Sequence, residues 1–351
     1  MLRLYPIFMN LDFLDLNTVW FLIVGILFTG YAMLDGFDLG VGALHLFTKK
    51  DEHRRMMLNS IGPVWDGNEV WLVTGGGALF AAFPEVYATA FSAFYIPFML
   101  LLAALIFRAV AIEFRSKAAS PTWRSCWDVS FFIGSILSAF LIGVTIGNIL
   151  WGIPLDEHFN YTGEFGYMMN PYAIFVGLTV VALFMMHGSI YVVLKTEGEL
   201  QEMAKKWVAK TVVLFLCFYV AFNVLTVFFV PDVKNVLLRR PHIAIIFLLN
   251  LLAVANIVRE LQKRRALRAF IFSCLSMAFL MALFGLTMYP NLIFAYPHSG
   301  NSINIYNGAS TDKTLQLMLW IALIGVPMVL AYTMSVYWIF RGKVKLTPES
   351  Y

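Results

Sequence analysis

Six charged residues stand inside or directly beside long apolar runs of this 351-residue chain. They are Asp35, Asp38, Asp66, Glu69, Arg108 and Asp128. If the runs cross a membrane, each such charge is unfavourable by about 2.5–3.5 kcal/mol on insertion scales, and it usually faces a partner or a water-filled cavity. Carboxylates in this setting can take up and release protons, and an arginine can balance their charge.

The acidic residues form two pairs, Asp35 with Asp38 and Asp66 with Glu69, each with a spacing of three. Side chains three residues apart lie on one face of a helix, so each pair would crowd two carboxylates together. Simpler explanations stay open for single residues. Asp35 and Gly36 can end a short first helix with a turn, and Asp66 can be a helix N-cap.

Arg108 is the one basic residue well inside an apolar run. Its planar guanidinium can bridge two carboxylates, so we expect a buried cluster of Asp38, Arg108 and Asp128. Asp35 and Glu69 would belong to the same group of buried charges. For Asp128 alone, an acid in the first turn of a helix is an equally simple explanation.

The composition indicates that lipid surrounds these segments. The chain is 60% hydrophobic and 13% charged, against about 25% charged residues in an ordinary soluble domain. Only helices and closed barrels span a bilayer, and apolar runs of about 20 residues without regular alternation favour helices. We therefore predict an all-α polytopic membrane protein with a single membrane domain, residues 1–351, and no nucleic-acid partner.

Nine segments are long enough to be spans. They cover roughly residues 17–46, 66–83, 86–112, 127–150, 171–194, 208–229, 242–259, 269–289 and 315–340. With this layout, 19 of the 25 lysines and arginines fall on one side, which predicts an outside N-terminus and a cytoplasmic C-terminus. The basic segment 231–242 is an exception, because the layout places it outside. The six buried charges all lie toward the cytoplasmic side.

Other features of the sequence suggest packing rather than chemistry. Acidic residues and a proline precede the first apolar run, so we expect no cleaved signal peptide. Cys126, Cys217 and Cys274 have neither disulfide-like nor metal-like spacing. Gly36, Gly40 and the stretch "TGGGALFAAF" (74–83) predict close packing of the first and second spans.

His187 is the one histidine in the middle of a predicted span. A haem held by two histidines would need a second mid-span histidine, and the sequence offers none. We therefore expect His187 to be a hydrogen-bonded core residue, and we assign neither a haem nor a metal ion to this chain.

Several motifs resemble subunit II of the cytochrome bd quinol oxidases. They are "GFDLGVG", "NSIGPVWDGNEVWLVTGGGALFAAFPEVYATAFSAFY", "FRAVAIEFRSK", "WRSCWDVSFFIGS" and "IGVTIGNILWGIP". The resemblance is specific over about the first 155 residues and weaker to the end. It implies two four-helix bundles, residues 17–150 and 171–289, plus an additional helix at 315–340.

The resemblance also implies a function. The chain would be an obligate partner of a related subunit I, which carries two b-type haems, one d-type haem and the quinol site. The complex would oxidise quinol and reduce dioxygen to water, taking protons from the cytoplasm, in the bacterial inner membrane. Small accessory subunits occur in the family, and some relatives hold a structural quinone in subunit II, although no residue here identifies that site.

Roles for individual residues follow from the same resemblance. Asp66, within "WDGN", resembles an acid on a proton route toward the oxygen-reducing haem of the partner. Trp65 and Trp71 would shape the subunit interface or a path for dioxygen. A proton-coupled secondary transporter is the alternative function, because the acids around Arg108 could also couple protons to a substrate. Charges gathered near one membrane face, without an inverted repeat, make the transporter the weaker alternative.

Overall fold

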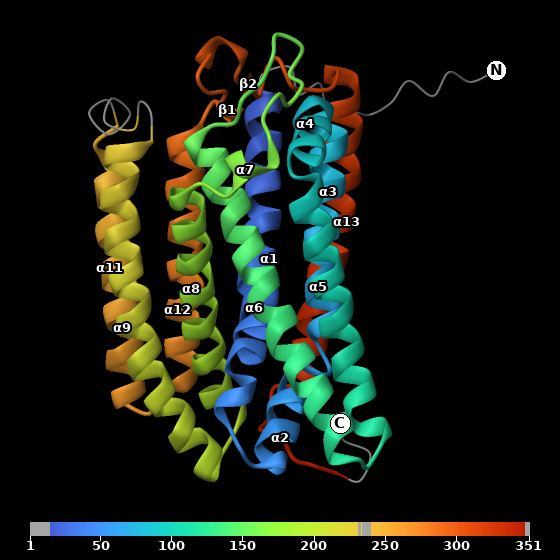
Figure 1. Ribbon diagram of the computed structural model, residues 1–351, viewed down its shortest axis with the longest axis vertical. Coiled ribbons are helices and arrows are strands. Elements are labelled where there is room, and N and C mark those ends of the chain that lie inside the picture. Colours follow the sequence, from blue (N-terminus) through green and yellow to red (C-terminus); the bar gives the residue numbers. More distant parts are fainter. Residues whose placement is uncertain (1–14, 231–232, 234–239, 348–351) are drawn as a thin grey trace, which may run out of the picture.

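The apolar runs form long helices in the computed structural model, which describes residues 15–230, 233 and 240–347 (Figure 1). Eight helices in this part of the chain are long and apolar enough to cross a membrane. The prediction of an all-α membrane protein is confirmed, with one short two-stranded sheet added. The N-terminal segment, on which the signal-peptide expectation depends, lies outside the described residues.

The long helices lie side by side and run along the long axis of the molecule (Figure 1). In chain order the elements are α1 (Leu16–Leu44), η1 (His45–Phe47), α2 (Asp51–Ile61), α3 (Trp65–Ala82), α4 (Pro84–Ala93), α5 (Tyr95–Phe114), η2 (Arg115–Lys117), α6 (Pro121–Trp151), α7 (Phe165–Met168), α8 (Pro171–Lys195), α9 (Gly198–Phe229), α11 (His242–Gln262), α12 (Ala266–Met288), β1 (Asn291–Ile293), η3 (Ser299–Asn301), β2 (Ile303–Asn304) and α13 (Asp312–Ile339).

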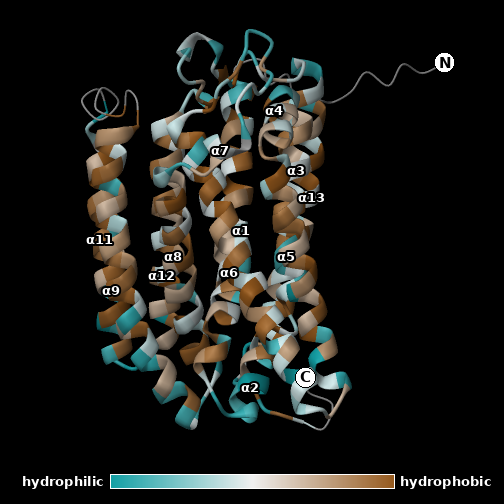
Figure 2. Ribbon diagram, viewed as in Figure 1, coloured by the Kyte–Doolittle hydropathy of each residue, from teal (hydrophilic) through white to brown (hydrophobic). Residues whose placement is uncertain are grey.

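Helix α1 lies at the centre of the packing and contacts α3, α6 and α8 (Figure 1). Helix α6 also packs along α5 and α8, while α9 lies beside α8 and α11 beside α12. Hydrophobic residues dominate the middle of the helices, and hydrophilic residues gather at both ends (Figure 2). This distribution fits helices whose middle sections lie in the hydrocarbon layer.

Helices α1 and α8 approach each other most closely where two glycines meet. A Cβ on Gly40 would lie 1.9 Å from the carbonyl oxygen of Phe184, and a Cβ on Gly188 would lie 2.4 Å from the carbonyl carbon of Gly40. Gly36 and Gly40 of α1 therefore serve contact with α8, while the predicted close packing of the first and second spans is made elsewhere on α1. Helix α3 meets α1 at other positions, with Gly75 against Phe28.

We expect Gly40→Ala to lower the free energy of unfolding by about 1–3 kcal/mol, because the added methyl overlaps backbone atoms and must push two helices apart. Thermal unfolding of the purified protein in detergent measures this. Gly25→Ala is the matched control on the same helix, since a Cβ there meets nothing within 4 Å. Equal stability of the two variants would contradict a close α1–α8 contact.

The third predicted span is interrupted in the structure, and one proline explains the break. The predicted span 86–112 is two helices, α4 and α5, with a break at Phe94. Pro97 lies in the first turn of α5 and has no N–H to donate to Ala93, and its ring crowds the same carbonyl, so the helix is interrupted there. The predicted span 66–83 corresponds to α3, whose first turn contains polar residues and which is not among the eight apolar helices.

Loops gather at the end of the molecule that carries β1 and β2, here called the sheet end (Figure 1). The β1–β2 hairpin and the α6–α7 connection bond to each other, with Ile153 N–H donating to the Phe294 carbonyl at 2.9 Å. Asp15 caps α1 at this end and accepts hydrogen bonds from Thr18 and Tyr306. The hydrogen bond from the Thr18 hydroxyl holds the pKa of Asp15 below its usual value.

The basic segment that seemed misplaced in the sequence has a structural use at the sheet end. Residues 231–232 and 234–239 of it lie outside the described range, but Arg240 is described. Its Nη1 donates to the carbonyl oxygens of Leu286, at 2.8 Å, and Tyr289, at 3.1 Å. A cation that binds the last carbonyls of a helix is favourable, so Arg240 caps α12.

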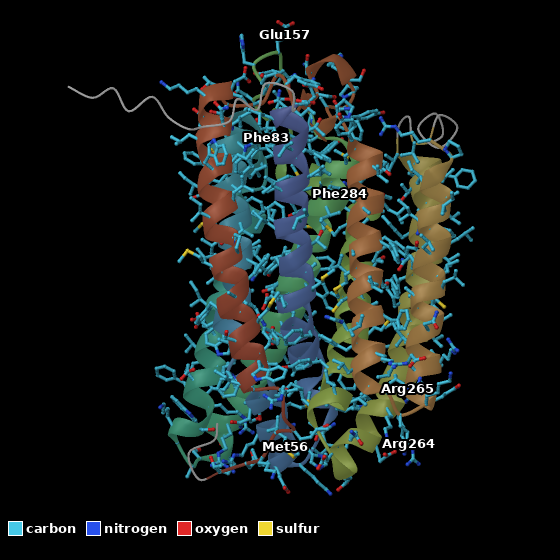
Figure 3. All side chains as sticks on the ribbon, turned by 180° about the vertical axis from the view of Figure 1, so that it is seen from behind. Met56, Phe83, Glu157, Arg264, Arg265 and Phe284 are labelled. Carbon is cyan, nitrogen blue, oxygen red and sulfur yellow. The ribbon has the colours of Figure 1, made fainter. Side chains whose placement is uncertain are left out.

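The opposite end, here called the α2 end, carries most of the basic residues that the charge count placed in the cytoplasm. Figure 3 shows Arg264 and Arg265 at the same end as Met56 of α2, and Glu157 at the sheet end. The segment after α13 docks here, with Lys343 Nζ donating to the carbonyls of Val193, at 3.3 Å, and Thr196, at 3.0 Å. Burial lowers the pKa of Lys343.

Candidate functional site

Arg108 joins two helices by binding two carboxylates. Its Nη2 donates to Asp35 Oδ1 at 3.1 Å, and its Nη1 donates to Glu69 Oε1. Arg108 and Asp35 are fully buried, while the side chain of Glu69 keeps 23% of its surface exposed. A buried charge is tolerated only when it is paired and hydrogen-bonded. These three residues, together with Asp38, are called the Arg108 cluster below.

A glycine on the neighbouring helix explains why Arg108 points inward. Gly134 of α6 lies directly against α5, and a Cβ there would come within 2.7 Å of the Ala104 carbonyl and 3.1 Å of the Arg108 Cβ. Helices α5 and α6 therefore pack closely at Arg108. The side chain has no room to run along α6 to the lipid, so it turns toward α1 and α3. Helix α1 continues to Leu44, so Asp35 lies inside it rather than in a turn, and the helix-end explanation for Asp35 was wrong.

Asp38 contacts Asn68 rather than Arg108. Asn68 Nδ2 donates to Asp38 Oδ2 at 2.7 Å and to the Leu34 carbonyl at 3.1 Å, and both Asp38 and Asn68 are buried. Asp38 Oδ1 and Arg108 Nε have no hydrogen-bond partner within the described part of the chain. The direct Asp38–Arg108 contact that we expected is therefore absent. Instead, α3 contacts both residues, with Asn68 bonded to Asp38 and Glu69 bonded to Arg108.

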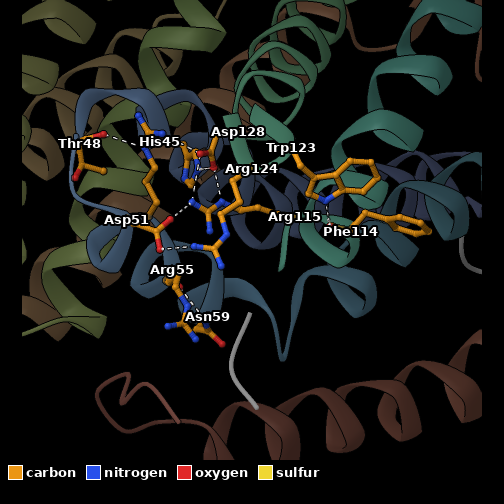
Figure 4. A network of polar contacts seen from close by, with 11 residues as sticks. His45, Thr48, Asp51, Arg55, Asn59, Phe114, Arg115, Trp123, Arg124 and Asp128 are labelled. Carbon is orange, nitrogen blue, oxygen red and sulfur yellow. Dashed lines mark hydrogen bonds and ion pairs between the residues drawn. The ribbon is translucent and has the colours of Figure 1, made fainter. Parts of the chain in front are cut away.

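Asp128 does not pair with Arg108 and belongs to a second group of charges. Figure 4 shows Asp128 beside His45 and Arg115. Asp128 Oδ1 lies 2.6 Å from His45 Nε2 and accepts from Arg115 Nε at 2.5 Å, and its Oδ2 accepts from Arg54 Nη1 at 2.8 Å. We call these four residues the Asp128 cluster. Asp51 extends it toward the surface by accepting from Arg115 Nη2 at 2.7 Å.

Two expectations for Asp128 were therefore wrong. Its partners are His45, Arg54 and Arg115, not Arg108, because α6 begins at Pro121 and presents Asp128 to η1, α2 and η2. The same early start places Asp128 in the third turn of the helix, so it is not a first-turn acid. The Asp128 cluster binds η1, α2, η2 and α6 together at the α2 end. The Arg108 cluster instead reaches the surface through Glu69 of α3, which is partly exposed.

Sequence reasoning missed the cationic members of the Asp128 cluster. His45 lies close to the end of the first predicted span, where a histidine is usually solvated, yet it is fully buried, and Arg115 is 1% exposed. Both arginines were counted only as cytoplasmic charge. A usable signal was present, because Asp128 is an acid within an apolar segment that lies on the side where arginines concentrate.

Asp66 is exposed on α3, three residues before Glu69 and one helical turn from the Arg108 cluster. The N-cap position of α3 is Val64 and carries no side-chain hydrogen bond, so the N-cap explanation for Asp66 was wrong. Trp71 packs on α1, where a Cβ on Gly30 would meet its ring at 2.4 Å. Trp65 packs partly buried against the core between the helices.

The residues of this chain do not fit a haem at His187. Its Nδ1 lies 2.7 Å from Ser273 Oγ, and its Nε2 lies 2.9 Å from the Met33 carbonyl, so both nitrogens are used within the chain. The ring also stacks on Phe270. His187 is thus a hydrogen-bonded core residue. Within the described ranges, no group of three or more His, Cys, Asp or Glu side chains could hold a metal ion.

Comparison with known proteins places this geometry in a family. Residues 16–340 match the family described as cytochrome bd terminal oxidase subunit II. Cytochrome bd-I ubiquinol oxidase subunit 2 of Escherichia coli (strain K12) is 37% identical over 366 residues, covering 95% of this chain and 96% of the relative. Cytochrome bd ubiquinol oxidase subunit 2 of Bacillus subtilis (strain 168) is 34% identical over 335 residues, covering 94% and 97%.

The fold is shared with a solved structure. A chain in the structure of bd oxidase from Geobacillus thermodenitrificans matches with a TM-score of 0.78, covering 93% of this chain and 99% of that chain. The two sequences are 16% identical, so this likeness concerns the fold alone.

Proposed function

The chain belongs to the cytochrome bd terminal oxidase subunit II family and is a subunit of a quinol oxidase complex, and we propose that it supports a haem-carrying subunit I and supplies that subunit with protons. Eight apolar helices agree with a multi-pass bacterial membrane protein. Membership in an oxidase family removes the reason to interpret the same charges as a transporter site.

The observation that carries the proposed proton route is a graded series of carboxylates. Asp66 is exposed, Glu69 is partly exposed, and Asp35 and Asp38 are fully buried. The series runs from the surface of α3 to the interior of α1, and Arg108 balances its charge where it enters the core. Carboxylates at successive depths can pass protons inward, and intramembrane acids commonly form such relays.

The surfaces of α3 and α13 are our proposed seat for the haem-carrying subunit. Val70 and Val73 of α3 are exposed beside the Asp66–Glu69 pair, and α13 is the candidate span that the chain itself covers least. A partner seated on this surface would shield the acids from lipid and receive protons from them. Trp71, packed on α1, and Trp65, packed against the core, would support this surface from the inner side rather than line a path for dioxygen.

The cofactors belong to the partner in this proposal. Two b-type haems and one d-type haem in subunit I would carry out quinol oxidation and dioxygen reduction. The residues of this chain hold and transfer protons, and none is assigned to a haem or to a structural quinone. Small accessory subunits of the kind found in the family could join the complex.

We also propose nine passes. Helix α3 would be the ninth crossing, with α4 and α5 forming one interrupted return, so that residues 17–150 and 171–289 form two four-helix bundles and 315–340 an additional helix. The α2 end would face the cytoplasm, since it carries the basic residues of the odd-numbered loops. Protons would then enter from the cytoplasm beside Asp66.

We expect Asp66→Asn in the assembled complex to lower oxygen consumption by about tenfold or more, because an amide cannot take up or release a proton at this position. The haem absorption spectrum should stay unchanged. Oxygen consumption with a quinol donor, measured across pH, checks this. Glu157→Gln, an exposed carboxyl change at the sheet end, is the control. Unchanged turnover at every pH would rule out the proton role of Asp66.

A further inference from the structure

Helix α13 is linked to the buried acids by a hydrogen bond of the Tyr337 side chain. The most apolar part of α13 is only 6% buried within the chain, so few contacts fix its position. Near its end, the Tyr337 hydroxyl donates to Asn68 Oδ1 at 2.9 Å. Tyr332, five residues earlier and therefore on another face of α13, is 69% exposed.

Asn68 passes this contact on to Asp38. Its carbonyl oxygen accepts from Tyr337, and its amide nitrogen donates to Asp38 Oδ2 and to the Leu34 carbonyl. Asn68 is 1% exposed, so water cannot replace a lost partner. Three helices, α13, α3 and α1, are thus connected by one line of hydrogen bonds that ends on a buried carboxyl group.

We propose that Tyr337 is a positioning residue, which holds the Asn68 amide in the orientation that donates to Asp38 and thereby makes proton exchange at Asp38 depend on the position of α13. The inference deepens the proposed proton route and rests on it. A partner bound against α13 would alter the Tyr337–Asn68 contact, so assembly of the complex would change proton exchange at Asp38.

Two physical effects act in the same direction. Donation by the Tyr337 hydroxyl polarises the amide and strengthens its N–H bond to the carboxylate, since hydrogen bonds in a chain reinforce one another. Without the hydroxyl, Asn68 Oδ1 becomes a buried acceptor with no donor, which is unfavourable. The amide can relieve this only by turning, and turning breaks its bond to Asp38.

Other charged and titratable groups also act on Asp38. They are Asp35 on α1, Glu69 on α3, Arg108 on α5, Tyr191 on α8 and Tyr337 itself on α13. Replacing Tyr337 with phenylalanine leaves the first four in place and removes one hydroxyl. A change at Asp38 in that variant is therefore attributable to the Asn68 contact.

The test is an infrared pH titration of the assembled complex, in which the carboxyl band of Asp38 is identified by its loss in Asp38→Asn. In Tyr337→Phe the titration midpoint should move to higher pH by about half a unit to one unit, because the carboxylate loses part of its donor. Oxygen consumption should fall by about three- to tenfold with the haem spectrum intact.

Tyr332→Phe is the matched control on the same helix, and it should leave the titration midpoint at the wild-type value, because Tyr332 is exposed and far from the Asn68 contact. A further variant shows whether the effect passes through Asn68. In an Asn68→Ala background, Tyr337→Phe should shift the midpoint by less than about 0.2 units. The Tyr337 hydroxyl then has no amide to orient, so its removal has no further effect on Asp38. An unchanged midpoint in Tyr337→Phe, or a full shift in the Asn68→Ala background, would overturn the proposal.

Failure of the proton route is distinguishable from failure of this inference. If Asp66→Asn and Asp38→Asn both leave turnover unchanged, the route is wrong, whatever Tyr337 does. The infrared titration does not need turnover, so a midpoint shift in Tyr337→Phe would still establish positioning of Asp38.

Discussion

Replacing Arg108 with leucine should sharply reduce the yield of the assembled complex. The substitution leaves Asp35 and Glu69 without their common partner, and Asp35 is fully buried. Removing one partner of a buried ion pair typically costs about 3–5 kcal/mol, because the remaining charge stays unpaired in a medium that solvates it poorly. Yield after affinity purification and thermal unfolding of whatever complex assembles measure the effect.

Two further variants separate charge from packing at this position. Arg108→Lys keeps the charge, but a lysine ammonium group lacks the planar guanidinium that binds two carboxylates at once. The stability of this variant should therefore fall between that of the wild type and that of Arg108→Leu. Asp35→Asn added to Arg108→Leu should restore part of the yield, since it removes the uncompensated charge. Wild-type yield and stability of Arg108→Leu would mean that the guanidinium reaches the membrane surface instead.

Asp128→Asn should destabilise the α2 end by a similar amount, about 3–5 kcal/mol. Asparagine keeps the size of the side chain, but its amide nitrogen cannot accept a hydrogen bond. Arg54 and Arg115 would then face each other around a neutral group, and Arg115 is almost fully buried. Thermal unfolding, together with the rate at which a protease cuts near α2, measures this loss.

Asp51→Asn is the matched control for this prediction. Asp51 also binds Arg115 and, at 3.3 Å, Arg124, but its side chain is 48% exposed. Water can replace an exposed partner, so its loss should cost about 0–1 kcal/mol. If Asp51→Asn and Asp128→Asn were equally mild, the Asp128 cluster would not be holding η1, α2, η2 and α6 together.

The two clusters differ in what surrounds them, and this difference suggests different uses. The Arg108 cluster includes the partly exposed Glu69 and lies beside the exposed Asp66, so protons can reach it. In the Asp128 cluster, one buried carboxylate is surrounded by donors from three other elements, which suits a fixed structural joint. Sequence spacing alone could not distinguish the two, because both consist of acids and arginines near one end of the helices.

Much of the fold could be predicted because lipid imposes simple rules on a sequence. Helices must satisfy their own backbone groups in the hydrocarbon layer, so the apolar runs gave nearly all the long helices. The break at Phe94 was missed although Pro97 marks it. The partner of Gly40 was also missed, because a glycine shows that some helix comes close without showing which one.

The sequence by itself determined the class of the protein, the places of its helices and the six charges that need partners in an apolar setting. Only the tertiary structure decided the pairing: Arg108 with Asp35 and Glu69, Asp38 with Asn68, and Asp128 with His45, Arg54 and Arg115. The physical reason is that an unpaired buried charge is unfavourable whatever its partner, whereas the identity of the partner depends on helix rotation and on where each helix begins. Those are set by contacts such as Gly40 on α8 and Gly134 on α5, which join residues far apart in the chain.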